Sequence, residues 1–217
     1  MEKALFRLFF ATDKLDVIYQ QHIDTSIPID TYWDLGINDS TCIWLSQRIR
    51  GEVRCIGFYE NNNEPLAHYI NWLMDFRNKE GVVFGKHHVP HDASKRDLST
   101  GKTVIDMGRE LGMTLTRVDR IRRKQDAIEM GRRLFKKCYF HKSNCKVGLS
   151  CLREYHKSFN EKMGVFSDNP VHNWASHGAD AYLTMAQVIE NKIDDHNKQR
   201  GKIVPYQPMK HFMYDNI

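Results

Sequence analysis

The sequence predicts an α/β protein with a central mixed sheet and helices on both faces. Two patterns indicate this fold class. Three strand-like segments follow one another through short turns within residues 31–60, which is typical of hairpin-connected antiparallel strands. After residue 60, helix-like and strand-like segments alternate, which is typical of parallel strands joined by crossover helices. A sheet with both kinds of connection is mixed, and helices are needed to cover its two faces.

The individual elements are placed by local signals. The segment 36–40, Gly-Ile-Asn-Asp-Ser, and the pair Gly51-Glu52 predict the turns between the first three strands. Pro65 opens an amphipathic helix with apolar residues every three to four positions, and Pro90 ends the following strand. The expected set is a helix at 2–14, a loop at 25–30, strands at 31–35, 42–50 and 54–60, a helix at 65–78, a strand at 82–89, a helix at 103–111, a strand at 113–118, and helices at 126–138, 148–159 and 176–191. The RNase H-like fold has this order of strands and helices.

Length and composition indicate a single globular domain. The chain has 217 residues, of which 41% are hydrophobic and 27% charged. We divide it into an N-terminal helix and lead-in (1–30), a core (31–191) and a C-terminal tail (192–217). No segment reaches the roughly 18 apolar residues that span a bilayer, so no membrane partner is expected. The five cysteines are an odd number and lack the regular spacing of a disulfide framework, which indicates a reducing compartment.

The positive charge is concentrated in one segment. The net charge is +5, yet residues 117–137 alone contain nine Lys or Arg and three acidic residues, so this segment carries +6 and the rest of the chain −1. A concentrated basic surface indicates a polyanionic partner, most commonly nucleic acid. The alternative is a solvated helix face without a partner.

Three aspartates stand at positions where chemistry is common. Asp34 ends the first strand, Asp92 follows the fourth strand, and Asp180 lies near the start of the last helix. If the first and fourth strands are central neighbours, Asp34 and Asp92 project from adjacent strand ends, and Asp180 joins them from a helix packed above. Clustered carboxylates repel one another unless cations neutralise them. Two Mg²⁺ or Mn²⁺ ions roughly 4 Å apart would do so, and would clamp the attacking and leaving oxygens of a phosphodiester. The alternative for each aspartate is a cap or turn residue.

Two further residues are weaker candidates. Asp39 follows Asp34 across a short turn, so it is either an outer metal ligand or a plain turn residue. His177 precedes Asp180 by three residues and shares its helix face, where it could ligate a metal, relay a proton to the leaving oxygen, or make a capping contact.

The surroundings of these aspartates resemble three motifs of the nuclease domain of tailed-bacteriophage large terminase subunits. The motifs occur in the family order, and the similarity runs from about residue 15 to residue 190. They are Tyr-Trp-Asp-Leu-Gly-Ile-Asn-Asp-Ser-Thr at 32–41, Pro-His-Asp-Ala at 90–93 followed by Arg-Asp-Leu-Ser-Thr-Gly at 96–101, and Trp-Ala-Ser-His-Gly-Ala-Asp-Ala at 174–181.

The resemblance implies an RNase H-like endonuclease that cuts double-stranded DNA with low sequence specificity during phage genome packaging. Asp34, Asp92 and Asp180 would then be the catalytic, metal-binding triad, with His177 as a further catalytic residue and Asp39 as a further ligand. The implied cofactors are two divalent cations, Mg²⁺ or Mn²⁺. The implied partners are double-stranded DNA, the terminase ATPase domain, the small terminase subunit and the portal protein, and the implied location is the host cell cytoplasm, at the procapsid packaging motor.

Basic residues outside the aspartate motifs are expected to contact DNA. Thr100-Gly101-Lys102-Thr103 is similar to the end of a P-loop, but Arg96 stands where that motif needs glycine, so we expect no nucleotide to bind this chain. The expected DNA contacts are Lys95, Arg96, Lys102, Arg120, Arg122, Arg123 and Lys124.

Two other functions remain open. One is another RNase H-like nuclease, such as a junction resolvase or an RNase H, with the same triad but a branched or hybrid substrate. The other is a non-catalytic, zinc-containing nucleic-acid-binding module. Its candidate ligands are Cys138, His141, Cys145, Cys151 and His156, which lack the paired short spacings of structural zinc sites. Cys138 and Cys151 also fall on apolar positions of predicted helices.

Overall fold

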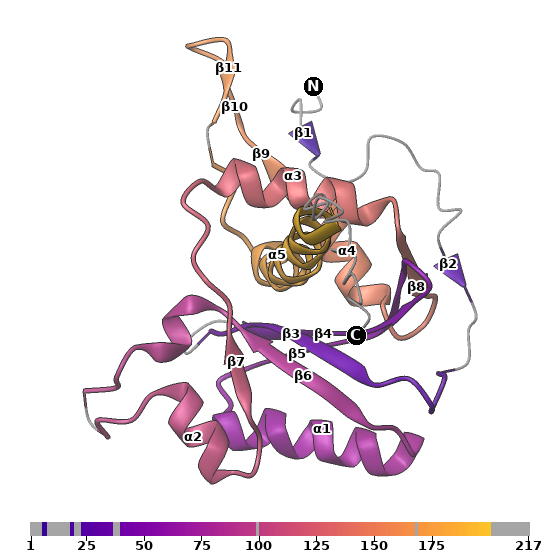
Figure 1. The fold of residues 1–217 in the computed structure, drawn as a ribbon. Coiled ribbons are helices and arrows are strands. Elements are labelled where there is room, and N and C mark those ends of the chain that lie inside the picture. The colour runs from indigo at the N-terminus through magenta and orange to yellow at the C-terminus, as the bar shows by residue number, and fades with distance from the viewer. Residues whose placement is uncertain are drawn as a thin grey trace, which may run out of the picture.

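The computed structural model describes residues 6–7, 18–19, 23–36, 40–98, 100–167 and 169–200, and its centre is a mixed sheet (Figure 1). The described residues form seven strands in this sheet, in the order β2-β8-β5-β4-β3-β6-β7. Their bounds are β2 Ile18–Tyr19, β3 Ile29–Asp34, β4 Ser40–Ile49, β5 Glu52–Asn62, β6 Phe84–Val89, β7 Leu115–Arg117 and β8 Cys138–His141. The pairs β3–β4 and β4–β5 are antiparallel, whereas β3–β6, β6–β7, β5–β8 and β2–β8 are parallel. The predicted mixed sheet is confirmed.

Helices cover both faces of the sheet. The helices α1 Leu66–Glu80 and α2 Val104–Glu110 lie on one side, and α3 Lys124–Phe135, α4 Lys146–Glu154 and α5 Ala175–Arg200 lie on the other (Figure 1). The core is divided accordingly: Trp33 packs in the cluster on the α1 side and its neighbour Tyr32 in the cluster on the α5 side. This division follows from the pleat, because successive strand residues point to opposite faces. None of the helices in the described part of the chain is long and apolar enough to cross a membrane.

Turn and cap residues set the boundaries of these elements. The β4–β5 turn is formed by Arg50 and Gly51, both with positive φ (50° and 91°), one residue before the predicted position. Two positive φ angles are required by the tight hairpin turn that suits twisted strands. Helix α1 ends at Glu80 and is capped by Gly81, which adopts φ 64°. Thr103 caps α2 by a reciprocal pair of hydrogen bonds with Asp106.

Several predicted elements in the C-terminal half were wrong in part. The helix expected at 126–138 ends at Phe135, and Cys138–His141 instead forms β8, which pairs with β5. The helix expected at 148–159 ends at Glu154, and three short strands follow, β9 His156–Lys157, β10 Phe159–Asn160 and β11 Val165–Phe166. The β10–β11 hairpin projects from the body of the molecule (Figure 1). Helix α5 continues to Arg200, beyond the predicted end at 191.

The N-terminal helix expected at 2–14 was wrong at the two residues that the structure describes there. Phe6–Arg7 forms the short strand β1, which pairs with β9. The rest of 2–14 lies outside the described residues.

The cysteines lie in the core rather than in a metal-binding arrangement. All five are buried free thiols, and Cys138 lies on a strand rather than on the predicted helix. Burial raises the pKa of Cys145 and of Cys151 to about 12, so both remain protonated at neutral pH. Among the described residues, which include all five cysteines, no three cysteine, histidine or acidic side chains are grouped closely enough to hold a metal ion.

Candidate active site

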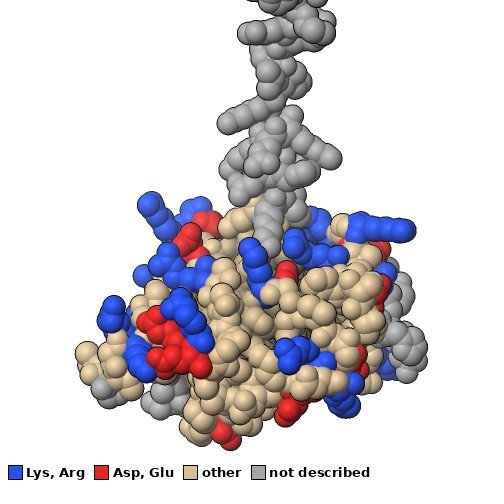
Figure 2. All heavy atoms as spheres, turned by 60° about the horizontal axis from the view of Figure 1, so that its bottom comes forward, with Lys and Arg blue, Asp and Glu red and all other residues tan. Residues whose placement is uncertain are grey.

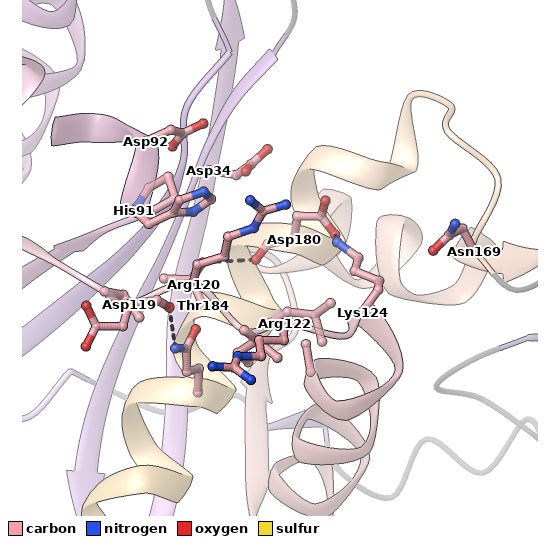
Figure 3. Close-up of a pocket in the computed structure, with 16 residues that line it drawn as sticks. Asp34, His91, Asp92, Asp119, Arg120, Arg122, Lys124, Asn169, Asp180 and Thr184 are labelled. Atoms are coloured by element: carbon pink, nitrogen blue, oxygen red, sulfur yellow. Dashed lines mark hydrogen bonds and ion pairs between the residues drawn. The ribbon is translucent and has the colours of Figure 1, made fainter. Parts of the chain in front are cut away.

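The three predicted aspartates line one pocket of about 430 Å³ (Figure 3). Strands β3 and β6 are parallel neighbours, with Tyr32 opposite His88, so both end at the same edge of the sheet. Asp34 is the last residue of β3. Asp92 follows β6 in a short 3-10 helix, η1 His91–Ser94. Asp180 comes from α5, which packs across β3 and β4. Adjacent parallel strand ends therefore account for two carboxylates and the covering helix for the third.

Local interactions hold the first turns of α5 against the sheet. Asn173 Oδ1 accepts a hydrogen bond from Ala175 N, and Ser176 Oγ accepts one from Asn173 N, which satisfies backbone donors where the helix begins. Inside the helix, Trp44 Nε1 donates to Gly178 O at 2.8 Å. A Cβ atom at Gly178 would lie 2.6 Å from Cys151 Sγ, so glycine permits the close approach of α5 to α4. These contacts fix the position of Asp180 above the strand ends.

Asp34 is held in a buried environment beside a histidine. Burial raises the pKa of Asp34; a hydrogen bond with His177 opposes this rise, and the nearby Asp180 adds to it. The distance from His177 Nδ1 to Asp34 Oδ2 is 3.0 Å. His177 also packs edge-to-face against His172, with ring centroids 5.4 Å apart. The imidazole therefore lies directly beside a carboxylate that is unfavourable to ionise.

Asp180 is already paired with a cation from the protein. Lys124 Nζ lies 2.6 Å from Asp180 Oδ1, and the Tyr155 hydroxyl donates to the same oxygen at 3.1 Å. Burial, followed by the negative charge of Asp180, raises the pKa of Tyr155, so its hydroxyl stays protonated as a donor. Lys124 was predicted as a DNA contact, but here its ammonium group faces the aspartate pocket.

Asp92 shows most clearly that the pocket fits a cation. Its Oδ1 is buried and accepts no hydrogen bond from the described residues. A buried carboxylate oxygen without a partner is costly, and a hard divalent cation is the ligand that such an oxygen prefers. The donor set of Asp34, Asp92 and Asp180 thus fits a divalent cation. Within the described ranges, no three acidic, histidine or cysteine side chains are grouped closely enough to hold an ion as they stand.

The other candidate residues are Asp39 and the three histidines close to Asp92 in the sequence, and they differ in where they lie relative to the pocket. Asp39 lies outside the described residues. Of the residues on either side of it, Thr41 Oγ1 hydrogen-bonds with both the N and the O of Gly36. Of the three histidines around Asp92, His91 lines the pocket. His87 is buried in the sheet, with its Nδ1 2.8 Å from Thr31 Oγ1, and His88 is buried and stacks on Tyr32.

The predicted DNA-contact residues separate into two groups. Arg120, Arg122 and Lys124 line the pocket, opposite the carboxylates from η1 and β3 (Figure 3), and Arg123 pairs with Asp126 at its margin. The second group lies around the loop before α2 and does not line the pocket: Lys95, Arg96 and Lys102. Lys102 pairs with Glu110 at 2.7 Å. Figure 2 shows basic and acidic side chains interspersed on the face around α1 and α2.

The residues that sequence reasoning missed are the partners of the aspartates. Tyr155 and Trp44 carried no motif signal, and Lys124 was assigned by charge alone. Gly178 did carry a signal, because glycine inside a helix is unfavourable unless close packing requires it.

The chain has the RNase H-like fold of large terminase nuclease domains. The large terminase of a thermophilic bacteriophage superposes with a TM-score of 0.65 at 17% identity, over 86% of this chain and 46% of that one. The nuclease domain of the P22 large terminase matches with a TM-score of 0.60 at 11% identity, over 85% of this chain and 92% of that domain. The SPP1 large terminase nuclease domain, solved with bound Mn, matches with a TM-score of 0.55 at 10% identity, over 77% and 92%.

The similarity is structural rather than a match at the level of sequence. No protein-family model matches the sequence, and no curated protein matches it. The chain spans about half the length of the thermophilic phage's large terminase. The structural resemblance agrees with the motif resemblance found in the sequence, and it establishes the fold.

Proposed function

We propose that this chain is an endonuclease that depends on divalent metal ions and cuts double-stranded DNA. The observation that carries the proposal is the convergence of Asp34, Asp92 and Asp180 on one pocket, where a buried oxygen of Asp92 has no partner among the described residues. The fold supports the same activity, because the similar P22 and SPP1 chains are nuclease domains and the SPP1 structure contains Mn.

The three aspartates would hold the metal ions, with Asp39 as a further candidate ligand. When bound, two Mg²⁺ or Mn²⁺ ions would stabilise the negative charge that develops on the phosphate during hydrolysis. Asp34 is held by His177 Nδ1, so His177 positions this carboxylate, and its imidazole is our candidate for the group that holds or releases a proton.

The basic side chains of the pocket would bind the DNA backbone. Arg120 and Arg122 line the pocket beside the carboxylates and suit phosphate oxygens. Contacts to phosphates position a duplex without reading its sequence, so we expect low sequence specificity. Lys124 would exchange its bond with Asp180 for a phosphate as the pocket fills.

The test is cleavage of supercoiled plasmid by the purified protein with Mn²⁺, with Mg²⁺ and with excess chelator. We expect cutting with either metal, none with chelator, and none by Asp92→Asn with metal. Asp75→Asn, which changes an exposed aspartate on α1 away from the pocket, is the matched control and should cut normally. Cutting in excess chelator, or full activity of Asp92→Asn, would contradict the proposal.

The same preparation distinguishes the alternatives. A panel of linear duplex, four-way junction and RNA–DNA hybrid separates a terminase-like nuclease from a resolvase or an RNase H. Stoichiometric zinc without cleavage would favour a binding module. By similarity to large terminases, we also propose that the nuclease works in phage DNA packaging in the host cytoplasm, together with an ATPase domain, a small terminase subunit and a portal protein.

A further inference from the structure

A second hollow, of about 620 Å³, adjoins the aspartate pocket. Arg122, Lys124 and Asn169 line both, so the two are continuous. The second hollow lies between the start of α3 and the base of the β10–β11 hairpin, and we call it the hairpin groove. Its lining residues are Arg122, Arg123, Lys124, Gln125, Arg132, Lys157, Phe166 and Asn169.

The hairpin groove is strongly basic. Its lining contains five lysine or arginine residues and no acidic residue. Arg123 and Arg132 are paired with acidic residues of α3, at 2.9 and 2.7 Å. Arg122 and Lys157, in contrast, make no ion pair with any described residue. Among the described residues, these two cations therefore have no acidic partner and can contact an anionic chain.

An aromatic side chain lies beside these cations. Phe166 lines the groove and is 37% exposed, and its ring packs edge-to-face against Phe159, 5.1 Å away. An exposed ring that is held in place by a second ring suits the stacking of a flat base. Cations along a groove with an aromatic ring between them are the pattern of single-strand binding, in which phosphates contact the cations and a base stacks on the ring.

We propose that the hairpin groove binds one unpaired strand of the DNA next to the cleavage site. Cations beside an exposed ring suit a strand whose bases are accessible, whereas the bases of a duplex are stacked on one another and paired. Stacking on Phe166 also requires a base that is exposed, as in a frayed or newly cut end. The phosphates lie on Arg122 and Lys157, and the strand continues into the aspartate pocket. This inference rests on the proposed nuclease function and adds a substrate preference for ends that can open.

The test measures binding in chelator, where no cutting interferes. Fluorescence anisotropy gives the affinity for a short single strand and for a blunt duplex, and a strand containing 2-aminopurine reports stacking. We expect Phe166→Ala to weaken single-strand binding by about tenfold and to abolish the 2-aminopurine quenching. We expect Lys157→Glu to weaken it by a similar factor and to lower the slope of log K against log salt by about 0.7 per lost phosphate contact.

Two controls make the result specific. Lys142→Glu reverses the charge of an exposed lysine outside the groove and should change single-strand affinity less than twofold. Phe166→Trp keeps a ring for stacking and should restore both affinity and quenching. Duplex affinity should change less than twofold in Phe166→Ala. Near-wild-type single-strand affinity in both groove variants, or equal losses for duplex and single strand, would overturn the inference.

The outcome is separable from that of the proposed function. Plasmid cleavage by the wild-type protein with Mn²⁺ tests the nuclease, whereas the anisotropy assay needs no cleavage. Loss of single-strand binding in the groove variants of a protein that cuts nothing would reject the nuclease alone. Normal cutting with unaltered single-strand binding would reject the groove alone.

Discussion

Replacing Asp180 by asparagine should destabilise the metal-free protein. Asp180 Oδ1 accepts hydrogen bonds from Lys124 and Tyr155, at 2.6 and 3.1 Å. A hydrogen bond to a charged group contributes about 1.5–3 kcal/mol. Lys124 is 36% exposed and Asp180 31% exposed, so solvent screening reduces this contribution to about 1–2 kcal/mol. For a domain of this size, the loss lowers the melting temperature by roughly 2–8 °C.

Replacing Asp34 by asparagine should have the opposite effect or none. Burial raises the pKa of Asp34, so the folded state binds its proton more tightly than the unfolded state does. The resulting stability is present below the ordinary pKa of 3.8 and is lost as the pH rises through the raised folded pKa. At neutral pH the ionised carboxylate is therefore a cost, which asparagine removes while its oxygen still accepts a hydrogen bond from His177.

The assay is thermal unfolding at neutral pH in chelator, with Asp75→Asn as the control. Repulsion among three carboxylates, considered without their partners, predicts that every single asparagine variant is at least as stable as wild type. The structure predicts that Asp180 departs from this rule. The double variant Lys124→Met/Asp180→Asn should lose less stability than the sum of the single variants, because both remove the same ion pair. An unchanged melting temperature for Asp180→Asn, or an equal fall for Asp34→Asn, would refute the reasoning.

Three further predictions concern the surroundings of the site. Gly178→Ala places a methyl group 2.6 Å from Cys151 Sγ, so it should cost about 1–3 kcal/mol of stability. Because the clash displaces α5 and with it Asp180, the variant should also bind Mn²⁺ more weakly, as measured by calorimetry. Wild-type Mn²⁺ affinity would show that α5 does not move. The double variant Arg120→Glu/Arg122→Glu should bind duplex DNA more weakly and with a smaller salt dependence, as measured by anisotropy across a salt series. An unaltered slope of log K against log salt would show that neither residue contacts the DNA. Burial lowers the pKa of His87 from 6.5 to about 4, so the stability that neutral His87 contributes is lost as the pH falls from about 6.5 to about 4, by up to about 3 kcal/mol. In His87→Gln, the free energy of unfolding, measured with denaturant, should depend less on pH in that window. A pH profile identical to that of the wild type would count against burial as the cause.

The elements that hold the aspartates could be predicted from the sequence because their signals are strong and local. The strand ending at Asp34 has turn residues on both sides, and Pro90 marks the end of the strand before Asp92. The pairing of β3 with β6 was only a condition of the sequence argument, and the structure shows that it brings the two residues to one edge.

The elements that were missed depend on tertiary contacts. Cys138–His141 is too short for a clear alternation and continues the apolar spacing of α3, so only its pairing with β5 makes it a strand. The hairpin formed by Phe159–Asn160 and Val165–Phe166 is two residues long on each side and leaves no periodic signal. The bond between Lys124 and Asp180 joins residues 56 positions apart, and no local pattern encodes such a pair.

The hydrogen bond from Trp44 to Gly178 determines which parts of the site can change independently. It links the turn of α5 that carries the third carboxylate to a fully buried indole in the middle of the sheet, which does not line the pocket. Loops around the opening can therefore be lengthened, shortened or given other charges to suit other substrates while Asp180 keeps its position. An engineer who wished to redirect the site would vary the hairpin and the start of α3, and would leave this indole and the glycine above it untouched.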